Sequence, residues 1–179
     1  MNQKFSHIDF TDACVDVFCF DNGTEVREYH AMIHVSTHRL PFQKQLEAVL
    51  NAYTVLIEER IPGAQAVFKR YFLSDAANQQ DEVIVADMTD CAKSIIQQAP
   101  LDGTKIALWV YLMTGVNTSI THSGLYAVEH NGFRHLWNGS AHNLAANSEY
   151  QTRLLFNEYL IEIIRYWGLG IGDWGLGIG

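Results

Sequence analysis

The first part of the chain alternates apolar and polar residues in a way that predicts a β-hairpin. Residues 14–20 (CVDVFCF) are rich in β-branched and aromatic types and lead into Asn22-Gly23, a strong hairpin-turn signal. The run that follows, residues 26–36, has a period of two: one face carries Tyr29, Ala31, Ile33 and Val35, and the other carries Glu28, His30, Met32 and His34. We therefore expect a strand with one face on a core and one more polar face.

The apolar period then changes to that of a helix. Pro41 suits the first helical position, and apolar residues recur at helical spacing until Pro62-Gly63. Residues 64–73 (AQAVFKRYFL) return to a strand-like composition and predict a third strand.

A second helix and a fourth strand are expected after that. Ser74 and Asp75 can cap the helix, and its apolar stripe is Ile84, Met88, Cys91 and Ile95. Residues 105–112 (KIALWVYL) predict the fourth strand. The order β-β-α-β-α-β indicates an α+β fold in which both helices cover one face of a mixed sheet.

The pattern restarts near residue 122, which indicates an internal repeat. Three blocks are echoed in order: VFCFDNG (17–23) by YAVEHNG (126–132), YHAMIHVSTH (29–38) by FRHLWNGSAH (133–142), and QLEAVLNAY (45–53) by QTRLLFNEY (151–159). We expect a complete unit over residues 1–116 and a truncated second unit over residues 117–167. Residues 168–179 contain WGLGIG twice and are interpreted as an artefact.

The composition disfavours several classes of protein. A formal net charge of −8 argues against nucleic acid as the main partner, because phosphate neutralisation supplies most of that affinity. The apolar runs are too short to span a bilayer, and the first ten residues lack the pattern of a signal peptide. Three cysteines, at positions 14, 19 and 91, suit a reducing compartment. A cytoplasmic protein is expected.

No metal or cofactor is expected. His30, His34 and His38 are four residues apart, which would suit zinc on a helix, but on a strand His30 and His34 are about 13 Å apart. They are interpreted as neutral histidines on the polar face of a sheet. The cysteines have no cationic neighbour in sequence and are interpreted as small buried hydrophobes rather than nucleophiles.

Two groups of residues could contribute to a site. Glu129, His130, Arg134, His135 and Trp137 surround the second hairpin and could supply an acid–base pair and an anion clamp. The alternative is a solvated hairpin with one aromatic residue in the core. Lys105, Trp109 and Tyr111 share one face of the fourth strand, where they could belong to a site or to an interface.

Two segments, VFKRYFLSDAANQ (67–79) and GLYAVEHNGFRHLWNGS (124–140), resemble the YjgF/RidA family, which carries the older label endoribonuclease L-PSP. The resemblance implies a chorismate-mutase-like fold, trimers whose sheets line a central barrel, and ligand clefts between subunits. Family activities include hydrolysis of reactive enamines and imines. The tandem arrangement also resembles, more distantly, the chorismatases.

The resemblance implies site residues as well. Tyr126 matches the pocket tyrosine of the family by position, and Lys105 stands nearest to the arginine with which family deaminases bind a substrate carboxylate. We expect a small carboxylate-bearing metabolite in an inter-subunit cleft, contacted by Lys105, Tyr126, Arg134 and Glu129, with enamine or imine hydrolysis if the protein is an enzyme. A lysine lacks the forked geometry of arginine, so a binding module without activity is an alternative. Chorismatase-like hydrolysis is another.

The polar sheet face also predicts assembly. It carries Met32, Trp109, Tyr111 and Met113, an apolar patch larger than a monomer usually exposes. We expect this face to be buried by the 122–167 segment, by a second chain, or by both, within a homo-oligomer that is a trimer or pseudo-trimer.

Overall fold

The computed structural model describes residues 2–121, 124–139, 153, 156–157 and 160–161, and the chain divides into two units. The first unit, Met1–Ser140, contains all the strands described below. In the second unit, Ala141–Gly179, the described residues are helical. The second copy of the third repeated block, residues 151–159, therefore lies largely outside the described residues, and the duplicated tail, residues 168–179, lies wholly outside them.

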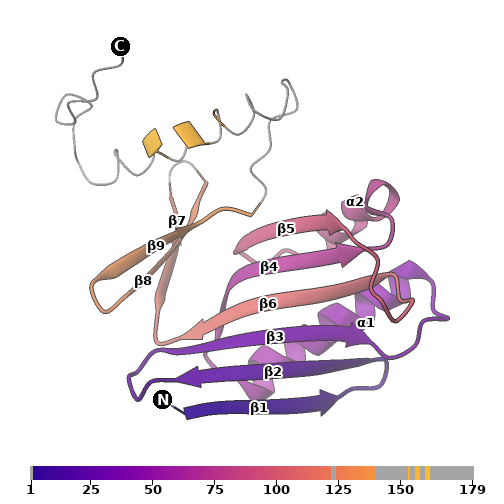
Figure 1. Ribbon diagram of the computed structural model, residues 1–179, viewed down its shortest axis with the longest axis horizontal. Helices are drawn as coiled ribbons and strands as arrows, with labels where there is room; N and C mark the ends of the chain where they lie inside the picture. Colours follow the sequence, from indigo (N-terminus) through magenta and orange to yellow (C-terminus); the bar gives the residue numbers. More distant parts are fainter. Residues whose placement is uncertain (1, 122–123, 140–152, 154–155, 158–159, 162–179) are drawn as a thin grey trace. The chain divides into compact units, whose positions relative to one another are not determined.

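The first unit is built on a six-stranded mixed sheet (Figure 1). Its strands, in spatial order, are β1 (Asn2–Asp9), β2 (Ala13–Asp21), β3 (Arg27–Val35), β6 (Ile106–Thr114), β4 (Gln65–Leu73) and β5 (Ala92–Gln97). Neighbouring strands are antiparallel except β4 and β5, which are parallel. Strands β4 and β5 need a crossover between them because they are parallel, and a helix supplies it.

Two helices cover one face of this sheet. They are α1 (Phe42–Val55), which continues into a π-helical turn, η1 (Leu56–Arg60), and α2 (Ala76–Ala86). The α1 stripe of Leu46, Val49 and Tyr53 packs on the alternate residues of the strands, and Val83 of α2 joins the same core. Burying each such aliphatic side chain contributes about 1.5–3 kcal/mol. The predicted α+β fold, with a mixed sheet and helices on one face, is confirmed.

The predicted faces of β3 are confirmed too. Ala31, Ile33 and Val35 are buried in the core, whereas His30 and His34 lie on the opposite face and are partly exposed. His38 lies after the strand, in the turn that leads to α1.

The end of the second helix was wrongly predicted. Helix α2 stops at Ala86 instead of continuing through Cys91 and Ile95, and residues 92–97 form β5. Ile84 and Met88, which were expected on the buried stripe, are 59% and 81% exposed. Parallel pairing with β4 satisfies the backbone of this segment, and that long-range contact overrides the local helical spacing.

Residues 2–9, for which the pattern predicts no element, form β1 at the edge of the sheet. Six of these eight residues are polar or charged, and the other two are Phe5 and Ile8, so the alternation is weak. Ile8 is only partly buried against the core, and pairing with β2 positions the strand.

A second sheet follows β6. It contains β7 (Asn117–Ile120), β8 (Tyr126–His130) and β9 (Phe133–Trp137), all antiparallel. The β8–β9 hairpin turns at Asn131 and Gly132, both of which have positive φ. This is the two-residue turn that an Asn-Gly pair favours, and it confirms the predicted hairpin.

The β7–β9 sheet covers part of the face of the large sheet that the helices leave open. Tyr126 and Val128 of β8 belong to a buried cluster with Phe68, Tyr111 and Met113 of that face. The Trp137 ring lies 6.0 Å from the Phe68 ring and 5.4 Å from the Tyr111 ring, centroid to centroid. One segment of the same chain thus buries aromatic residues that would otherwise be in water.

Candidate functional site

Lys105, one of the four predicted ligand residues, lies in the bend before β6. Its backbone N–H donates to Gln45 Oε1 at 2.7 Å, and its carbonyl accepts from the Ser74 N–H at 3.0 Å. The backbone of Lys105 is therefore held by two hydrogen bonds, although the residue as a whole is exposed to solvent. Lys105 marks the end of the sheet where β4 finishes.

Tyr126 belongs to the buried cluster that contains Phe68 of β4 and Tyr111 and Met113 of β6. Of these two β6 residues Tyr111 is the nearer to Lys105 in sequence, and it is six positions away, which is about 20 Å at the usual strand rise. Lys105 and Tyr126 of one chain therefore cannot contact the same small ligand.

Glu129 and Arg134 form a pair on the β8–β9 hairpin. They are opposite each other in register, and Arg134 Nε lies 3.3 Å from Glu129 Oε1. Because side chains alternate along a strand, this pair lies on the opposite face of β8 from Tyr126. Within one chain the structure brings Glu129 and Arg134 together, but it does not bring them to Tyr126 or Lys105.

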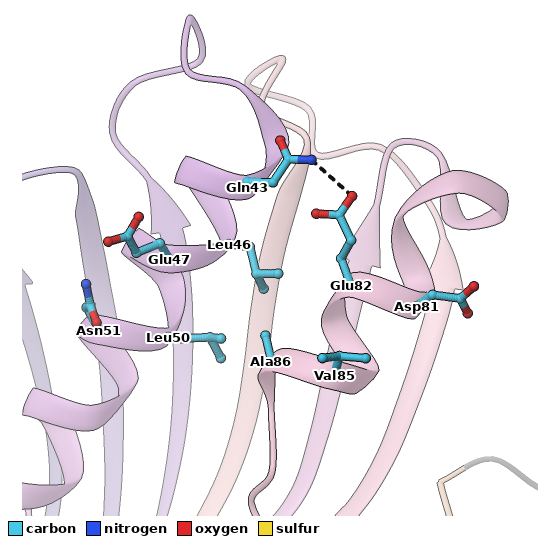
Figure 2. Close-up of a pocket in the computed structure, with 9 residues that line it drawn as sticks. All are labelled: Gln43, Leu46, Glu47, Leu50, Asn51, Asp81, Glu82, Val85 and Ala86. Atoms are coloured by element: carbon cyan, nitrogen blue, oxygen red, sulfur yellow. Dashed lines mark hydrogen bonds between the residues drawn. The ribbon is translucent and has the colours of Figure 1, made fainter.

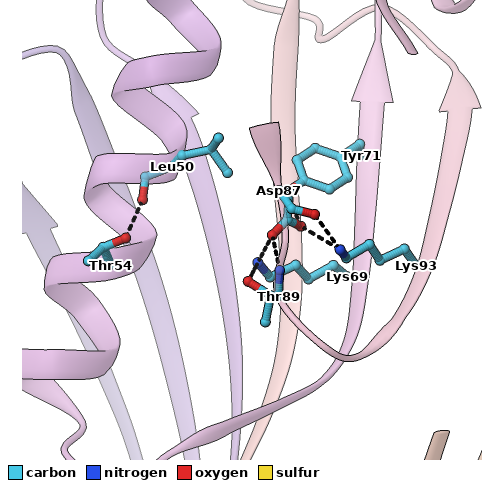
Figure 3. A network of polar contacts seen from close by, with 7 residues as sticks. All are labelled: Leu50, Thr54, Lys69, Tyr71, Asp87, Thr89 and Lys93. Carbon is cyan, nitrogen blue, oxygen red and sulfur yellow. Dashed lines mark hydrogen bonds and ion pairs between the residues drawn. The ribbon is translucent and has the colours of Figure 1, made fainter. Parts of the chain in front are cut away.

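A buried charge cluster that the sequence reading missed lies between β4 and the end of α2 (Figure 3). The Lys69 side chain is fully buried, and its Nζ donates to Asp87 Oδ1 at 3.0 Å and to Thr89 Oγ1 at 2.9 Å. The Tyr71 hydroxyl donates to Asp87 Oδ2 at 2.7 Å. Lys69 Nζ also lies 3.6 Å from the centre of the Tyr53 ring, a favourable cation–π position.

Burial and pairing act against each other on the pKa values of this cluster. Burial alone would raise the pKa of Asp87, but the Lys69 ammonium and the hydrogen bonds from Tyr71, Lys69 and Thr89 hold it below its ordinary value. Burial lowers the pKa of Lys69, and attraction to Asp87 opposes that change. Burial, reinforced by the Asp87 charge, raises the pKa of Tyr71. Asp87 is thus the charged acceptor at the centre of the cluster.

Lys93 adds a second cation to the same carboxylate. It lies directly opposite Lys69 in the parallel β4–β5 register. Its Nζ donates to the backbone oxygen of Asp87 at 2.5 Å and is 3.6 Å from Asp87 Oδ2. Two ammonium groups therefore share one buried carboxylate, which leaves a net positive charge on this cluster.

Lys93 also lines a cavity of about 310 Å³ between the start of β5 and the β7–β9 sheet. The walls include Thr89, Cys91, Tyr126 and Trp137, and the exposed Asp90 is the acidic residue among them. The indole Nε1–H of Trp137 has no hydrogen-bond partner among the described residues. Of the predicted ligand residues, Tyr126 is the one that lines this cavity.

The described residues that line this cavity include no activated nucleophile. Burial raises the pKa of the Cys91 thiol to about 11, although Lys69 opposes this, so the thiol is protonated at neutral pH. Burial also raises the pKa of the Tyr126 hydroxyl. Tyr126 is therefore a neutral phenol that can donate or accept a hydrogen bond.

A larger groove of about 630 Å³ lies between α1 and α2 (Figure 2). Its apolar walls include Leu46, Leu50 and Val85, and the Gln43 amide donates to Glu82 Oε1 at 3.1 Å across it. The charged side chains that line it, Glu47, Asp81 and Glu82, are all acidic. This groove would repel an anion, so the smaller cavity at Lys93 is the better candidate for an anionic ligand.

Across the described parts of the chain, no three His, Cys, Asp or Glu side chains come close enough together to hold a metal ion. Within the same residues, no helix has the length and apolar character needed to cross a membrane.

The sequence contains a signal for the buried Lys69–Asp87 pair, which the pattern analysis did not single out. Lys69 shares its strand face with Tyr71 and Leu73, which are both fully buried. A lysine at a core-facing position needs a buried acid as partner, because an unpaired buried charge is costly. Which acid it is, and that Lys93 shares it, depends on the β4–β5 pairing.

Comparison of the chain with models of protein families, with curated proteins and with solved structures found no match.

Proposed function

We propose that the chain is a YjgF/RidA-like protein that binds a small carboxylate-bearing metabolite in the cavity between β5 and the β7–β9 sheet. The observation that carries the proposal is the position of Lys93, which lines the cavity and shares the buried carboxylate of Asp87 with Lys69, so that these three side chains carry one more positive than negative charge. A ligand carboxylate beside Lys93 would balance that charge.

The donors around the cavity suit such a ligand. A lysine ammonium has three N–H donors, and Lys93 uses one of them for the Asp87 carbonyl. The Tyr126 hydroxyl and the Trp137 indole N–H would supply neutral donors to other ligand oxygens. The volume, about 310 Å³, is at the small end of the range for ligand pockets, which fits a metabolite of a few carbon atoms.

If the protein is an enzyme, hydrolysis of an enamine or imine is the reaction we propose. Water would add to the C=N carbon, and the nitrogen would leave as ammonia. Lys93 would position the carboxylate in that reaction. The described residues that line the cavity include neither a thiolate nor a histidine, so the proposal names no catalytic residue.

The binding proposal is tested with pyruvate, 2-oxobutanoate and chorismate in thermal-shift and calorimetric titrations. A ligand at one hundred times its Kd should raise the free energy of unfolding by about 2.7 kcal/mol. Lys93→Gln should abolish that gain, and Lys105→Gln, a matched change at an exposed lysine outside the cavity, should leave it intact. Equal binding by the wild type and Lys93→Gln would refute the assignment.

Turnover is measured separately, with enamines derived from amino acids. Release of ammonia above background that Lys93→Gln lowers would identify an imine hydrolase. Binding without turnover favours the alternative, a binding module without activity. This alternative is supported by the lack of an arginine among the described residues that line the cavity. Hydrolysis of chorismate would favour the chorismatase-like alternative.

We also propose that the chain assembles into a trimer or pseudo-trimer through the open sheet face. The β7–β9 sheet covers only part of that face, and Phe5 of β1 remains 62% exposed on it. Light scattering tests this: a trimer should have three times the mass of the chain, and a strict monomer would contradict the proposal.

A further inference from the structure

A second cavity, of about 440 Å³, lies on the helix-facing side of the sheet beneath β1, β2 and β3. Lys4, Cys19 and Tyr29 form a row across its floor, because Lys4 pairs with Cys19 and Cys19 pairs with Tyr29. Arg60, the last residue of the π-helical turn η1, lines its wall. None of the predicted ligand residues lies here, and the cavity is distinct from the one at Lys93.

Positive charge is concentrated in this cavity. Three of its nine lining residues are cationic, Lys4, Arg27 and Arg60, and one, Asp21, is acidic. Arg27 Nε lies 3.1 Å from Asp21 Oδ2, which accounts for one cation. Among the described residues no acidic side chain forms an ion pair with Lys4 or Arg60. The cavity therefore has an excess of two positive charges in a chain whose net charge is −8.

The π-helical turn positions Arg60. Leu56 is fully buried at its beginning, Ile61 is buried just after it, and the Ile61 N–H donates to the Leu56 carbonyl at 2.9 Å. Arg60 is thus held between two core residues while its own side chain remains exposed. Single π-helical turns inside helices occur frequently at functional sites, where the extra residue redirects a side chain.

We propose that this cavity binds the phosphate group of a small phosphomonoester. Two arginines and a lysine around one space suit a dianion with three terminal oxygens, since guanidinium groups bind phosphate in a forked geometry. Val17 and Ile61 supply an apolar wall for the organic part of the ligand, and the volume exceeds what a free ion needs. A nucleic acid is disfavoured as the source of the phosphate by the acidic chain as a whole.

The test is calorimetric titration of the full chain with glycerol 3-phosphate, inorganic phosphate and, at matched ionic strength, sodium chloride. Glycerol 3-phosphate should bind more tightly than inorganic phosphate, and chloride should not replace either. Arg60→Gln and Lys4→Gln should each weaken binding roughly tenfold, the loss expected for one charge-assisted contact. Arg39→Gln, a change at an exposed arginine outside the cavity, should have no effect.

Three outcomes would overturn the proposal. The first is unchanged phosphate affinity in Arg60→Gln and Lys4→Gln, and the second is an equal loss in Arg39→Gln, which would indicate a non-specific charge effect. The third is glycerol 3-phosphate binding no more tightly than inorganic phosphate, which would leave a free-ion site. Lys93→Gln should keep full affinity for glycerol 3-phosphate. Loss of phosphate binding at Arg60 and loss of carboxylate binding at Lys93 can therefore be told apart.

Discussion

Two hairpins of the first unit, β2–β3 and β8–β9, have the same Asn-Gly turn signal and different structures. The β2–β3 hairpin, with Asn22-Gly23, has nine-residue strands and a loop of residues 22–26. The β8–β9 hairpin, with Asn131-Gly132, has five-residue strands and a turn of those two residues alone. Identical local chemistry therefore does not determine the length of the loop.

Packing explains the longer loop. Val26 is buried and belongs to the cluster that contains Val116 and Tyr126. Gly115 lies directly against the loop: a Cβ at this position would be 2.5 Å from the Glu25 carbonyl oxygen. Within the loop, Asn22 Oδ1 accepts hydrogen bonds from the backbone N–H and the hydroxyl of Thr24. The first hairpin is thus shaped by tertiary contacts, whereas the second follows its own turn.

The largest effect is expected at Asp87, in the buried charge cluster between β4 and the end of α2. Asp87→Asn would leave the Lys69 ammonium buried without a charged partner, and breaking such a pair costs about 3–5 kcal/mol. Chemical denaturation should show both hairpins losing stability together. Asp90→Asn, at an exposed neighbour, should change the free energy of unfolding by less than about 0.5 kcal/mol. A loss at Asp87 no larger than at Asp90 would contradict the buried pair.

A smaller loss is expected at the contact that shapes the first hairpin. Gly115→Ala would place a Cβ against the Glu25 carbonyl at a φ of 70°, and the free energy of unfolding should fall by about 2–3 kcal/mol. Gly23→Ala is the matched control, because it has a similar φ of 81° and open space around it. It should cost about 1 kcal/mol. Equal losses would show that backbone conformation, and not the close approach, determines the effect.

Trp137→Ala should affect the second hairpin alone. It removes the ring contacts with Phe68 and Tyr111, worth about 2 kcal/mol when aromatic pairing and burial are combined. Hydrogen exchange should quicken in β8 and β9 and stay slow in β2 and β3. Phe133→Ala removes a ring that is 67% exposed on the same hairpin, and it should change the hydrogen-exchange rates of β8 and β9 little. Equal acceleration in both hairpins would mean that they unfold as one unit.

The smallest effect should appear at β1, which pairs with the first hairpin. Hydrogen bonds to Asp16 at 2.7 Å and to Asp9 at 3.2 Å raise the pKa of His7 above its ordinary value of 6.5. A raised folded-state pKa means that the stabilisation is complete below pH 6.5 and is lost as pH rises through the higher folded value. Proton NMR titration of His7 should show the raised pKa, and Asp16→Asn should lower it. His38→Gln should leave the titration unchanged.

Local patterning predicted the elements that lie within one stretch of chain. The alternation in residues 26–36 correctly placed Ala31, Ile33 and Val35 in the core, and the helical spacing after Pro41 correctly predicted α1. These predictions succeed because each buried face repeats with the period of its own element. For β5, the spacing of Cys91 and Ile95 also fitted a helix, and the pattern favoured the wrong element.

The candidate site was less predictable, because its residues come from separate elements. Tyr126 was expected to contact a ligand and does line the cavity, whereas Lys105 lies six positions along β6 from Tyr111 of the Tyr126 cluster, a separation of about 20 Å. Lys93 had no distinguishing neighbours in sequence. It became a candidate only when β5 paired with β4 and placed it beside Lys69 and Asp87.

The sequence by itself therefore determined the hairpins, the first helix and the face of β3 that is buried, since the information for each lies within a few turns or pleats. Tertiary structure decided where α2 ends, which strand borders β4, how long the first hairpin loop is, and which charges share Asp87. These four features depend on contacts between residues far apart in the chain. A buried charge needs an oppositely charged partner, and the backbone groups of a strand edge need a paired strand, before either is stable.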